Sequence, residues 1–130
     1  MSIRAIGTDV VAIQRMRELL SRYGERLARR ILSDREFASL PGDAEGQASF
    51  LARRFAAKEA AAKALGTGIA RGVRFGDLET VHEPTGQPRL VLSGGAAQRA
   101  HELEVANCHL SLSDEREYAL AFVILETANR

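Results

Sequence analysis

The sequence predicts an α+β fold, in which N-terminal helices, including one long buried helix, pack on a mostly antiparallel sheet. Two observations predict this order of elements. Apolar residues recur at helical spacing through the first half of the chain. The second half instead contains short apolar runs divided by Gly, Pro and Asp residues, which is typical of antiparallel strands. The 130 residues contain no internal repeat and no Pro- or Ser-rich linker, so we expect a single domain over residues 1–130.

The opening segment predicts a strand followed by helices. Residues 3–8 have strand character, and Asp9 is expected just past the end of this strand. Residues 11–23 then place their apolar side chains on one side of a helix, and Gly24 ends it. Residues 25–32 continue with helical spacing.

The next segment predicts a short helix, a loop and the long helix. Ser33 and Glu36 have the spacing of a capping box, so a helix of one or two turns is expected to begin there and to end at the next Pro-Gly pair. Residues 43–46 are expected to form a loop. Residues 47–65 are rich in strong helix formers and are followed by Gly66, a typical helix end. This long helix is the clearest element of the sequence.

The second half predicts two pairs of strands with a helix between them. After a glycine-punctuated loop, the expected elements are strands at 78–82 and 89–92, a helix at 95–103, and a hairpin of strands at 105–113 and 117–125. Residues 118–125 are apolar at both alternating sets of positions. We therefore expect this last strand to be central and buried on both faces.

The composition excludes several classes of protein. Hydrophobic residues make up 45% of the chain and charged residues 27%, so a disordered chain is not expected. No run of about 18 apolar residues is present, which argues against a membrane-spanning helix. The N-terminus has no secretory signal pattern, and the lone Cys108 cannot form an internal disulfide, so we expect a cytoplasmic protein with Cys108 as a small buried hydrophobe.

The charge is unevenly distributed, although the net charge is only +1. Residues 1–63 carry 12 Lys and Arg against 8 Asp and Glu, whereas residues 64–130 carry 6 against 9. Residues 14–35 alone hold seven arginines and three acids. Such a cluster suits an anionic partner, either nucleic acid, a membrane or an acidic protein, but a solvated helical face explains it equally well. The low aromatic content, 5% with no Trp, disfavours single-stranded RNA.

Glu59 and Lys63 are four residues apart on the long helix, so they lie on the same face. The simplest interpretation is a surface ion pair within one helix. The surroundings argue for more, because the helix consists almost entirely of alanines and other apolar residues, and charged groups on a buried helix need compensation.

Asp9, between a strand and a helix, suggests either an N-cap or a ligand-binding group. One Asp and one Glu without thiols or clustered histidines favour a hard cation such as Mg²⁺ over zinc. Since Mg²⁺ fills most of its coordination shell with water and substrate phosphate, Lys63 would act as a point charge on another phosphate oxygen. The combination predicts a phosphate-bearing substrate.

The glycines that follow the long helix do not form a nucleotide-binding loop of known type. Residues 66–74 lack the order of a P-loop and follow a helix instead of preceding one, and no dinucleotide-binding fingerprint is present. His109 alternates with leucines on a predicted strand, so it is expected on the polar face with Ser111 and Ser113. A phosphate or sugar donor and a structural hydrogen bond are equally good interpretations of His109.

Four segments in order along the chain resemble motifs of the holo-acyl-carrier-protein synthases, which are 4′-phosphopantetheinyl transferases. Residues 7–15 (GTDVVAIQR) resemble the opening motif of that family, and residues 54–68 (RFAAKEAAAKALGTG) are similar to its central signature almost letter for letter. Residues 86–88 resemble its G-[KR]-P turn, and residues 109–113 resemble its H-x-S-h-[ST] strand. The resemblance spans nearly the whole chain, from Ile6 to about Ile124.

The resemblance implies transfer of the 4′-phosphopantetheine group from coenzyme A to a serine of apo acyl carrier protein, for fatty acid biosynthesis, with release of adenosine 3′,5′-bisphosphate. Asp9 and Glu59 match the Mg²⁺ ligands of the family. Lys63 matches the lysine near the coenzyme phosphates, so Glu59 and Lys63 are the expected catalytic residues. A non-catalytic binding module and a Mg²⁺-dependent phosphohydrolase are the alternatives.

The resemblance also implies the binding surfaces and the assembly. Arg54, His109, Gly86 and Pro88 match positions that line the coenzyme pocket. The helix that begins near Arg15 matches the one that docks the acidic carrier protein, so the expected docking residues are Arg15, Arg22 and Arg26. The partner is then a protein, and neither nucleic acid nor a membrane. Members of the family are homotrimers with active sites between subunits, and Gly86 to Pro88 would approach the adenine from a neighbouring copy.

Two positions depart from the family pattern. Asp114 stands where many members have a second histidine, and Gln87 replaces the usual basic residue of the turn. The resemblance therefore gives no role to Asp114, and Gln87 either weakens a phosphate contact of the turn or changes nothing.

Overall fold

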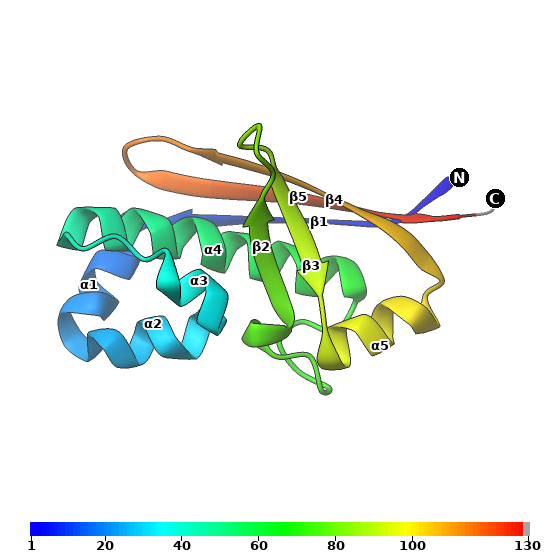
Figure 1. Cartoon of the computed structure of the whole chain (residues 1–130), viewed down its shortest axis with the longest axis horizontal. Coiled ribbons are helices and arrows are strands. Elements are labelled where there is room, and N and C mark those ends of the chain that lie inside the picture. Colours follow the sequence, from blue (N-terminus) through cyan, green and yellow to red (C-terminus); the bar gives the residue numbers. More distant parts are fainter. Residues whose placement is uncertain (129–130) are drawn as a thin grey trace.

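The computed structural model describes residues 1–128, so the last two residues of the expected domain lie outside the described part. It has the expected α+β architecture (Figure 1). The elements are β1 (Ser2–Ala12), α1 (Ile13–Tyr23), α2 (Glu25–Ile31), α3 (Asp34–Ala38), α4 (Ala44–Leu65), the 3-10 helix η1 (Phe75–Asp77), β2 (Leu78–His82), β3 (Pro88–Leu92), α5 (Gly94–Glu102), β4 (Val105–Asp114) and β5 (Tyr118–Thr127).

The strands form two separate sheets. Strands β1, β5 and β4 form an antiparallel sheet in that order, and β2 and β3 form a separate antiparallel hairpin. Figure 1 shows α4 lying along the three-stranded sheet, with α1, α2 and α3 on the other side of the helix and the hairpin crossing it. No helix among residues 1–128 is long and apolar enough to cross a membrane.

Helix α4 is the centre of the core because its side chains are small. Thirteen of its residues are buried, and eight of these are alanines. Small side chains allow other elements to approach the helix closely on several sides. The larger core residues, such as Met16, Leu51, Leu65 and Leu125, fill the remaining space around the helix.

Two expected boundaries were wrong for local reasons. Asp9 lies inside β1, because this strand pairs with β5 from Ser2 to Ala12, with one register shift between Ile3 and Ala5. Residues 43–46 are not a loop. The Oδ2 atom of Asp43 accepts a hydrogen bond from the Gly46 backbone N–H at 2.9 Å, and this N-cap starts α4 at Ala44.

Strand β5 is central, as expected, but it is not buried on both faces within one chain. Its inward residues, such as Ala119 and Val123, are fully buried against α4. Its outward residues are large and exposed, with Tyr118 50% and Phe122 40% accessible. Ile6 and Val10 of β1 join them on the same face of the sheet, so this face carries an apolar patch.

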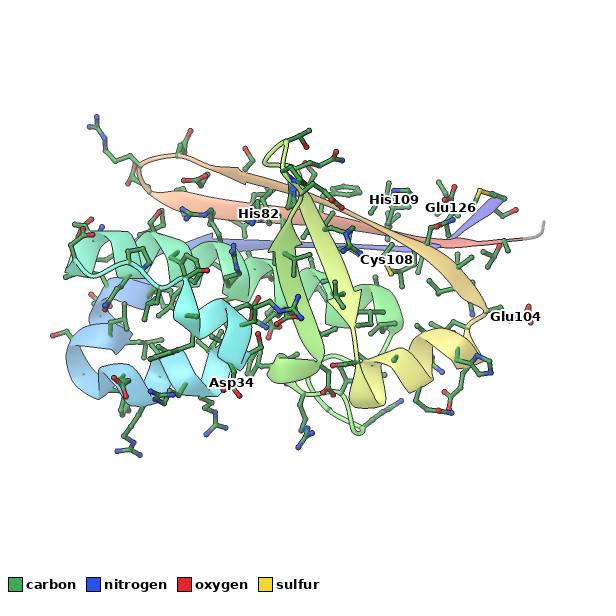
Figure 2. The ribbon with its side chains drawn as sticks, in the orientation of Figure 1. Asp34, His82, Glu104, Cys108, His109 and Glu126 are labelled. Carbon is green, nitrogen blue, oxygen red and sulfur yellow. The ribbon has the colours of Figure 1, made fainter. Side chains whose placement is uncertain are left out.

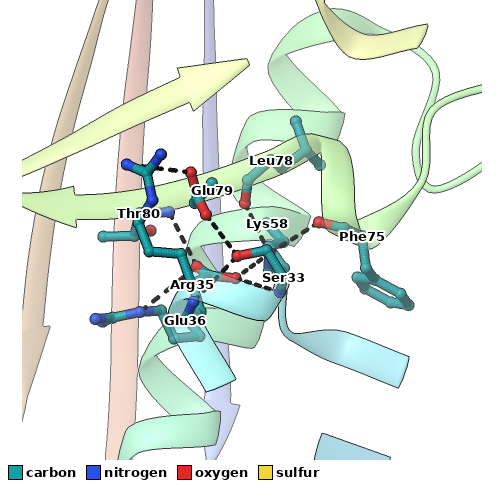
Figure 3. A network of polar contacts seen from close by, with 9 residues as sticks. Ser33, Arg35, Glu36, Lys58, Phe75, Leu78, Glu79 and Thr80 are labelled. Carbon is teal, nitrogen blue, oxygen red and sulfur yellow. Dashed lines mark hydrogen bonds and ion pairs between the residues drawn. The ribbon is translucent and has the colours of Figure 1, made fainter. Parts of the chain in front are cut away.

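A buried ionic network connects α3, α4 and β2 (Figure 3). The ammonium of Lys58 is completely buried and uses its three donors on the carbonyls of Phe75 and Leu78, each at 2.8 Å, and on Glu36 Oε1 at 2.7 Å. Glu36 belongs to the expected capping box, in which Ser33 Oγ accepts from the Glu36 N–H. Glu36 Oε2 also accepts the N–H of Thr80 at 2.9 Å, on the free edge of β2.

Burial lowers the pKa of Lys58, and the charge of Glu36 opposes this shift. A buried charge of either sign is stable here only while its partner is present. The network therefore fixes how α4 is rotated relative to α3 and to the hairpin.

We predict that Lys58→Met destabilises the protein by about 3 kcal/mol or more, because it leaves Glu36 and two carbonyls without their buried donor. Urea unfolding at fixed protein concentration measures the free energy. Lys63→Met, at an exposed lysine of the same helix, should cost less than about 1 kcal/mol. If both variants lost the same free energy of unfolding, the buried network would contribute no more to stability than an exposed lysine does.

Candidate active site

Asp9, Glu59 and Lys63 come together where β1 crosses α4. The ammonium of Lys63 donates to Asp9 Oδ1 at 2.9 Å and to the Thr8 carbonyl at 3.0 Å. Glu59 lies one turn earlier on α4 and is partly buried. Asp9, from the beginning of the chain, thus meets a pair of charged residues from α4.

The electrostatics of Glu59 show that its carboxyl group lies close to several charges. Burial raises the pKa of Glu59, and the negative charge of Asp9 raises it further. The positive charges of Lys63 and Arg15 lower it by smaller amounts. The site therefore holds two carboxylates in a partly desolvated place, with one ammonium already in contact with Asp9.

The simpler interpretations of these residues do not hold. Lys63 pairs with Asp9 of β1, and no ion pair between Lys63 and Glu59 is present among the described residues. Asp9 does not cap α1, since the N-cap position is Ala12 and makes no side-chain hydrogen bond.

Gly7 explains why β1 can approach α4 so closely. A Cβ atom at this position would lie 2.0 Å from the carbonyl oxygen of Ala60 and 2.9 Å from the backbone nitrogen of Ala64. Only glycine therefore fits at this crossing. The contact is two residues from Asp9, so it sets the distance between Asp9 and the helix.

The donor set fits a hard cation, although no group of three or more His, Cys, Asp or Glu residues is present within residues 1–128. Two carboxylates are enough for Mg²⁺, which completes its shell with water and substrate oxygens. Asp9 is mostly buried and its charge raises the pKa of the partly buried Glu59, so a cation between the two carboxylates would relieve their repulsion.

The three arginines expected to dock a partner lie at different distances from this group. Arg15 belongs to it, with its guanidinium 5.8 Å from the centre of the Phe55 ring of α4. Arg22 lies over the Tyr23 ring at 6.0 Å, and Arg26 lines an open cavity of about 550 Å³ along α2. Neither Arg22 nor Arg26 has an ion-pair partner among the described residues, so both charges face solvent.

Arg54 lies on another face of α4, away from Asp9. It is buried, 3.6 Å from Glu36 Oε2 and 4.4 Å from the centre of the Phe50 ring. Its Nε and the hydroxyl of Thr80 are both buried and have no hydrogen-bond partner within the described residues. Both residues line a cavity of about 400 Å³, which also includes Arg35 and His82. An anion with several oxygens would satisfy these groups.

His109 and the hairpin turn lie in yet other places. His109 is on the outward face of the three-stranded sheet with its side chain 57% exposed, and its Nε2 is 2.9 Å from Glu126 Oε1 (Figure 2). Gly86 has the positive φ of 91° that the turn before Pro88 requires. Figure 1 shows this turn projecting past the sheet.

One chain therefore brings together only part of the expected site. Asp9, Glu59, Lys63 and Arg15 form one group, whereas Arg54, His109 and the turn at 86–88 are not gathered around it. Sequence reasoning also missed two partners, Glu36 of Lys58 and Glu126 of His109. The capping box predicted Glu36 as a helix cap, but nothing in the spacing of residues predicted its ion pair with Lys58.

The two positions that depart from the family pattern have ordinary surroundings. Asp114 Oδ2 is 3.6 Å from an Arg53 guanidinium nitrogen, in an ion pair on the surface of α4. The Gln87 carbonyl accepts the N–H of Glu83, which closes the hairpin turn.

The matching family model and the similar proteins point to the same protein family. Residues 5–123 match the family model of the 4′-phosphopantetheinyl transferase superfamily. The holo-[acyl-carrier-protein] synthase of Halorhodospira halophila is 57% identical over 125 residues, which cover 96% of this chain and 98% of that protein.

Two solved structures extend the comparison to the fold. The crystal structure of the holo-[acyl-carrier-protein] synthase from Neisseria meningitidis has a TM-score of 0.87 at 38% identity, covering 96% of this chain and 99% of that one. The enzyme from Bacillus anthracis, solved in complex with CoA (3′,5′-ADP), has a TM-score of 0.78 at 35% identity, covering 98% and 100%.

We predict that Gly7→Ala destabilises the protein by at least about 2 kcal/mol, because the clash is with backbone atoms that no rotamer change can relieve. Urea unfolding measures the loss. The matched control is Gly42→Ala, at an exposed glycine with nothing within 4 Å of the added atom, which should change stability little. A harmless Gly7→Ala would mean that β1 can move away from α4 freely.

Proposed function

Since the chain belongs to the holo-[acyl-carrier-protein] synthase family of 4′-phosphopantetheinyl transferases, we propose that it transfers 4′-phosphopantetheine from coenzyme A to a serine of apo acyl carrier protein. The meeting of Asp9, Glu59 and Lys63 carries the proposal, since these residues lie in the two motifs shared with the family. The holo-carrier would then serve fatty acid biosynthesis in the cytoplasm.

The reaction exchanges one phosphorus–oxygen bond for another. The serine oxygen attacks the phosphorus on the pantetheine side, and the bond to the adenosine-side phosphate breaks. Adenosine 3′,5′-bisphosphate leaves with the electron pair. The protein mainly has to hold the reactants in line and compensate negative charge.

Asp9 and Glu59 would hold Mg²⁺, which when bound supplies neutralising charge on the pyrophosphate. Lys63 is the group of this chain that supplies positive charge directly. Its ammonium lies on Asp9 in the free protein and is half exposed, so it can turn towards a phosphate oxygen.

The serine proton needs an acceptor, because a neutral hydroxyl is a weak nucleophile. Glu59, the partly buried carboxylate beside Asp9, is one candidate for this role, and a water molecule held at the cation would be the other.

The acidic carrier would dock on the arginines of α1 and α2. Arg22 and Arg26 keep their charges in solvent, and Arg15 connects this surface to Glu59. A carrier bound along these helices would present its serine at the site between β1 and α4. Charge attraction of this kind mainly increases the rate of encounter and selects the partner.

The rest of the coenzyme site would come from a neighbouring copy in a homotrimer. His109, Gly86 and Pro88 are separated from Asp9 within one chain. The outward face of the sheet that carries His109 also carries exposed Ile6, Val10 and Phe122. Packing of this face against another copy would bury the apolar patch. It would also bring His109, Gly86 and Pro88 of one copy to Asp9 of the other. Arg54, whose Nε is 3.6 Å from Glu36 Oε2 and makes no hydrogen bond within the described residues, would take an anionic group of the coenzyme.

Intact-mass spectrometry tests the activity. We predict that apo carrier gains one phosphopantetheinyl group after incubation with this protein, coenzyme A and Mg²⁺, and that EDTA abolishes the gain. Glu59→Gln should lower the rate at least about a hundredfold, because it removes a metal ligand and a candidate proton acceptor. Glu102→Gln, at an exposed carboxylate of α5, is the control and should transfer normally. Near-normal transfer by Glu59→Gln would contradict its role.

Steady-state kinetics test the docking surface. Arg22→Glu combined with Arg26→Glu should raise KM for the carrier about tenfold or more, because two attractive charges become repulsive. KM for coenzyme A should stay within about twofold. Arg71→Glu combined with Arg74→Glu, at two exposed arginines in the loop after α4, makes the same charge change elsewhere and should leave both constants unchanged. Equal increases in both constants for the double variant would argue against docking on these helices.

A further inference from the structure

Glu126 and His109 form an isolated polar pair on the outward face of the sheet. Their strands, β5 and β4, are adjacent, and the residue directly opposite His109 is Ile124, so the contact to Glu126 runs diagonally. The distance from His109 Nε2 to Glu126 Oε1 is 2.9 Å, which is that of a good hydrogen bond. Figure 2 shows the two side chains close together on the same side of the ribbon.

The position of Glu126 is unusual for a carboxylate. The outward positions of β5 before it are Tyr118, Leu120, Phe122 and Ile124, so Glu126 ends an otherwise apolar row. Its side chain is 25% exposed in one chain, less than that of His109 at 57%. A carboxylate at the end of a row that another copy would cover needs a partner, and His109 is that partner.

The hydrogen bond constrains the chemistry of the ring. A carboxylate only accepts hydrogen bonds, so His109 must donate from Nε2. The other ring nitrogen, Nδ1, makes no hydrogen bond within the described residues. With Nε2 committed to Glu126, Nδ1 is the nitrogen left to meet a ligand.

We propose that Glu126 is a positioning residue for His109, which it holds by Nε2 so that Nδ1 faces the coenzyme and donates to one of its phosphate oxygens. This inference rests on the proposed function. While the phosphate is bound, the ring donates from both nitrogens, and the carboxylate balances its charge. Glu126 itself touches no substrate, since it acts only through the ring.

A purely structural role predicts something different. If the pair only stabilised the fold, its loss would lower the melting temperature slightly and leave coenzyme binding unchanged. A positioning role predicts weaker coenzyme binding from a ring that turns freely, with docking of the carrier unaffected. The neutral variant Glu126→Gln separates orientation from charge, because its amide oxygen can still accept from Nε2.

Calorimetry of coenzyme A binding is the direct test. We expect Glu126→Ala to weaken binding about tenfold and Glu126→Gln less than about threefold. KM for the carrier and the melting temperature should stay as in the unaltered protein. Glu115→Ala removes an exposed carboxylate in the turn between the same two strands and should bind normally.

The double variant decides whether Glu126 acts through the ring. Added to His109→Ala, the change Glu126→Ala should cause no further loss of binding. Independent, multiplying losses would overturn the inference, and so would unchanged binding by Glu126→Ala in a protein that otherwise binds and transfers normally. If the unaltered protein fails to bind coenzyme A, the proposed function fails first, and this inference fails with it.

Discussion

The buried pair of Glu36 and Lys58 is the interaction on which the other parts of the structure depend. It joins α3, α4 and the root of the β2–β3 hairpin at one point, through contacts of 2.7–2.9 Å. Residues four apart share a helix face, so Arg54 and Lys58 face this network, and Glu59 and Lys63 point to the next face, where β1 lies. By fixing the rotation of α4, one ion pair therefore decides which charged residues meet which strand.

The second constraint is the close crossing of β1 and α4, and it accounts for the chemistry of the site. Gly7 allows backbone contact with Ala60, which holds Asp9 near the helix. The same approach partly buries Glu59 and exposes it to the charge of Asp9, so its pKa rises. The arrangement costs stability in the free protein, because two carboxylates repel each other where solvent screens them poorly. A cation and a phosphate-bearing substrate would remove this repulsion. Repulsion that only a ligand relieves is typical of a binding site and is not expected of an ordinary surface ion pair.

The sequence predicted the type and order of the elements because each carries a local pattern. The capping box of Ser33 and Glu36, the limits of β2 and the end of α4 at Gly66 are all confirmed. Features that depend on distant residues could not be predicted. The extension of β1 through Asp9 requires its pairing with β5, and the partner of Lys58 lies 22 positions away in the sequence. The sequence also could not show that the outward face of β5 is exposed within one chain, because apolar side chains in an exposed patch look the same in sequence as apolar side chains in a core.

We propose that the functional site is completed by two copies of the chain, with Asp9, Glu59 and Lys63 from one and His109 from the other. The most direct measurement mixes Glu59→Gln with His109→Ala under conditions in which subunits exchange, at a coenzyme A concentration too low for either variant to transfer by itself. If the site is shared, a site is intact when its Glu59 comes from the His109→Ala chain and its His109 comes from the Glu59→Gln chain. Random mixing produces this combination at roughly a quarter of the sites, so transfer returns. If native mass spectrometry shows mixed assemblies and no activity returns, each chain uses its own residues, and the account of a shared site is wrong.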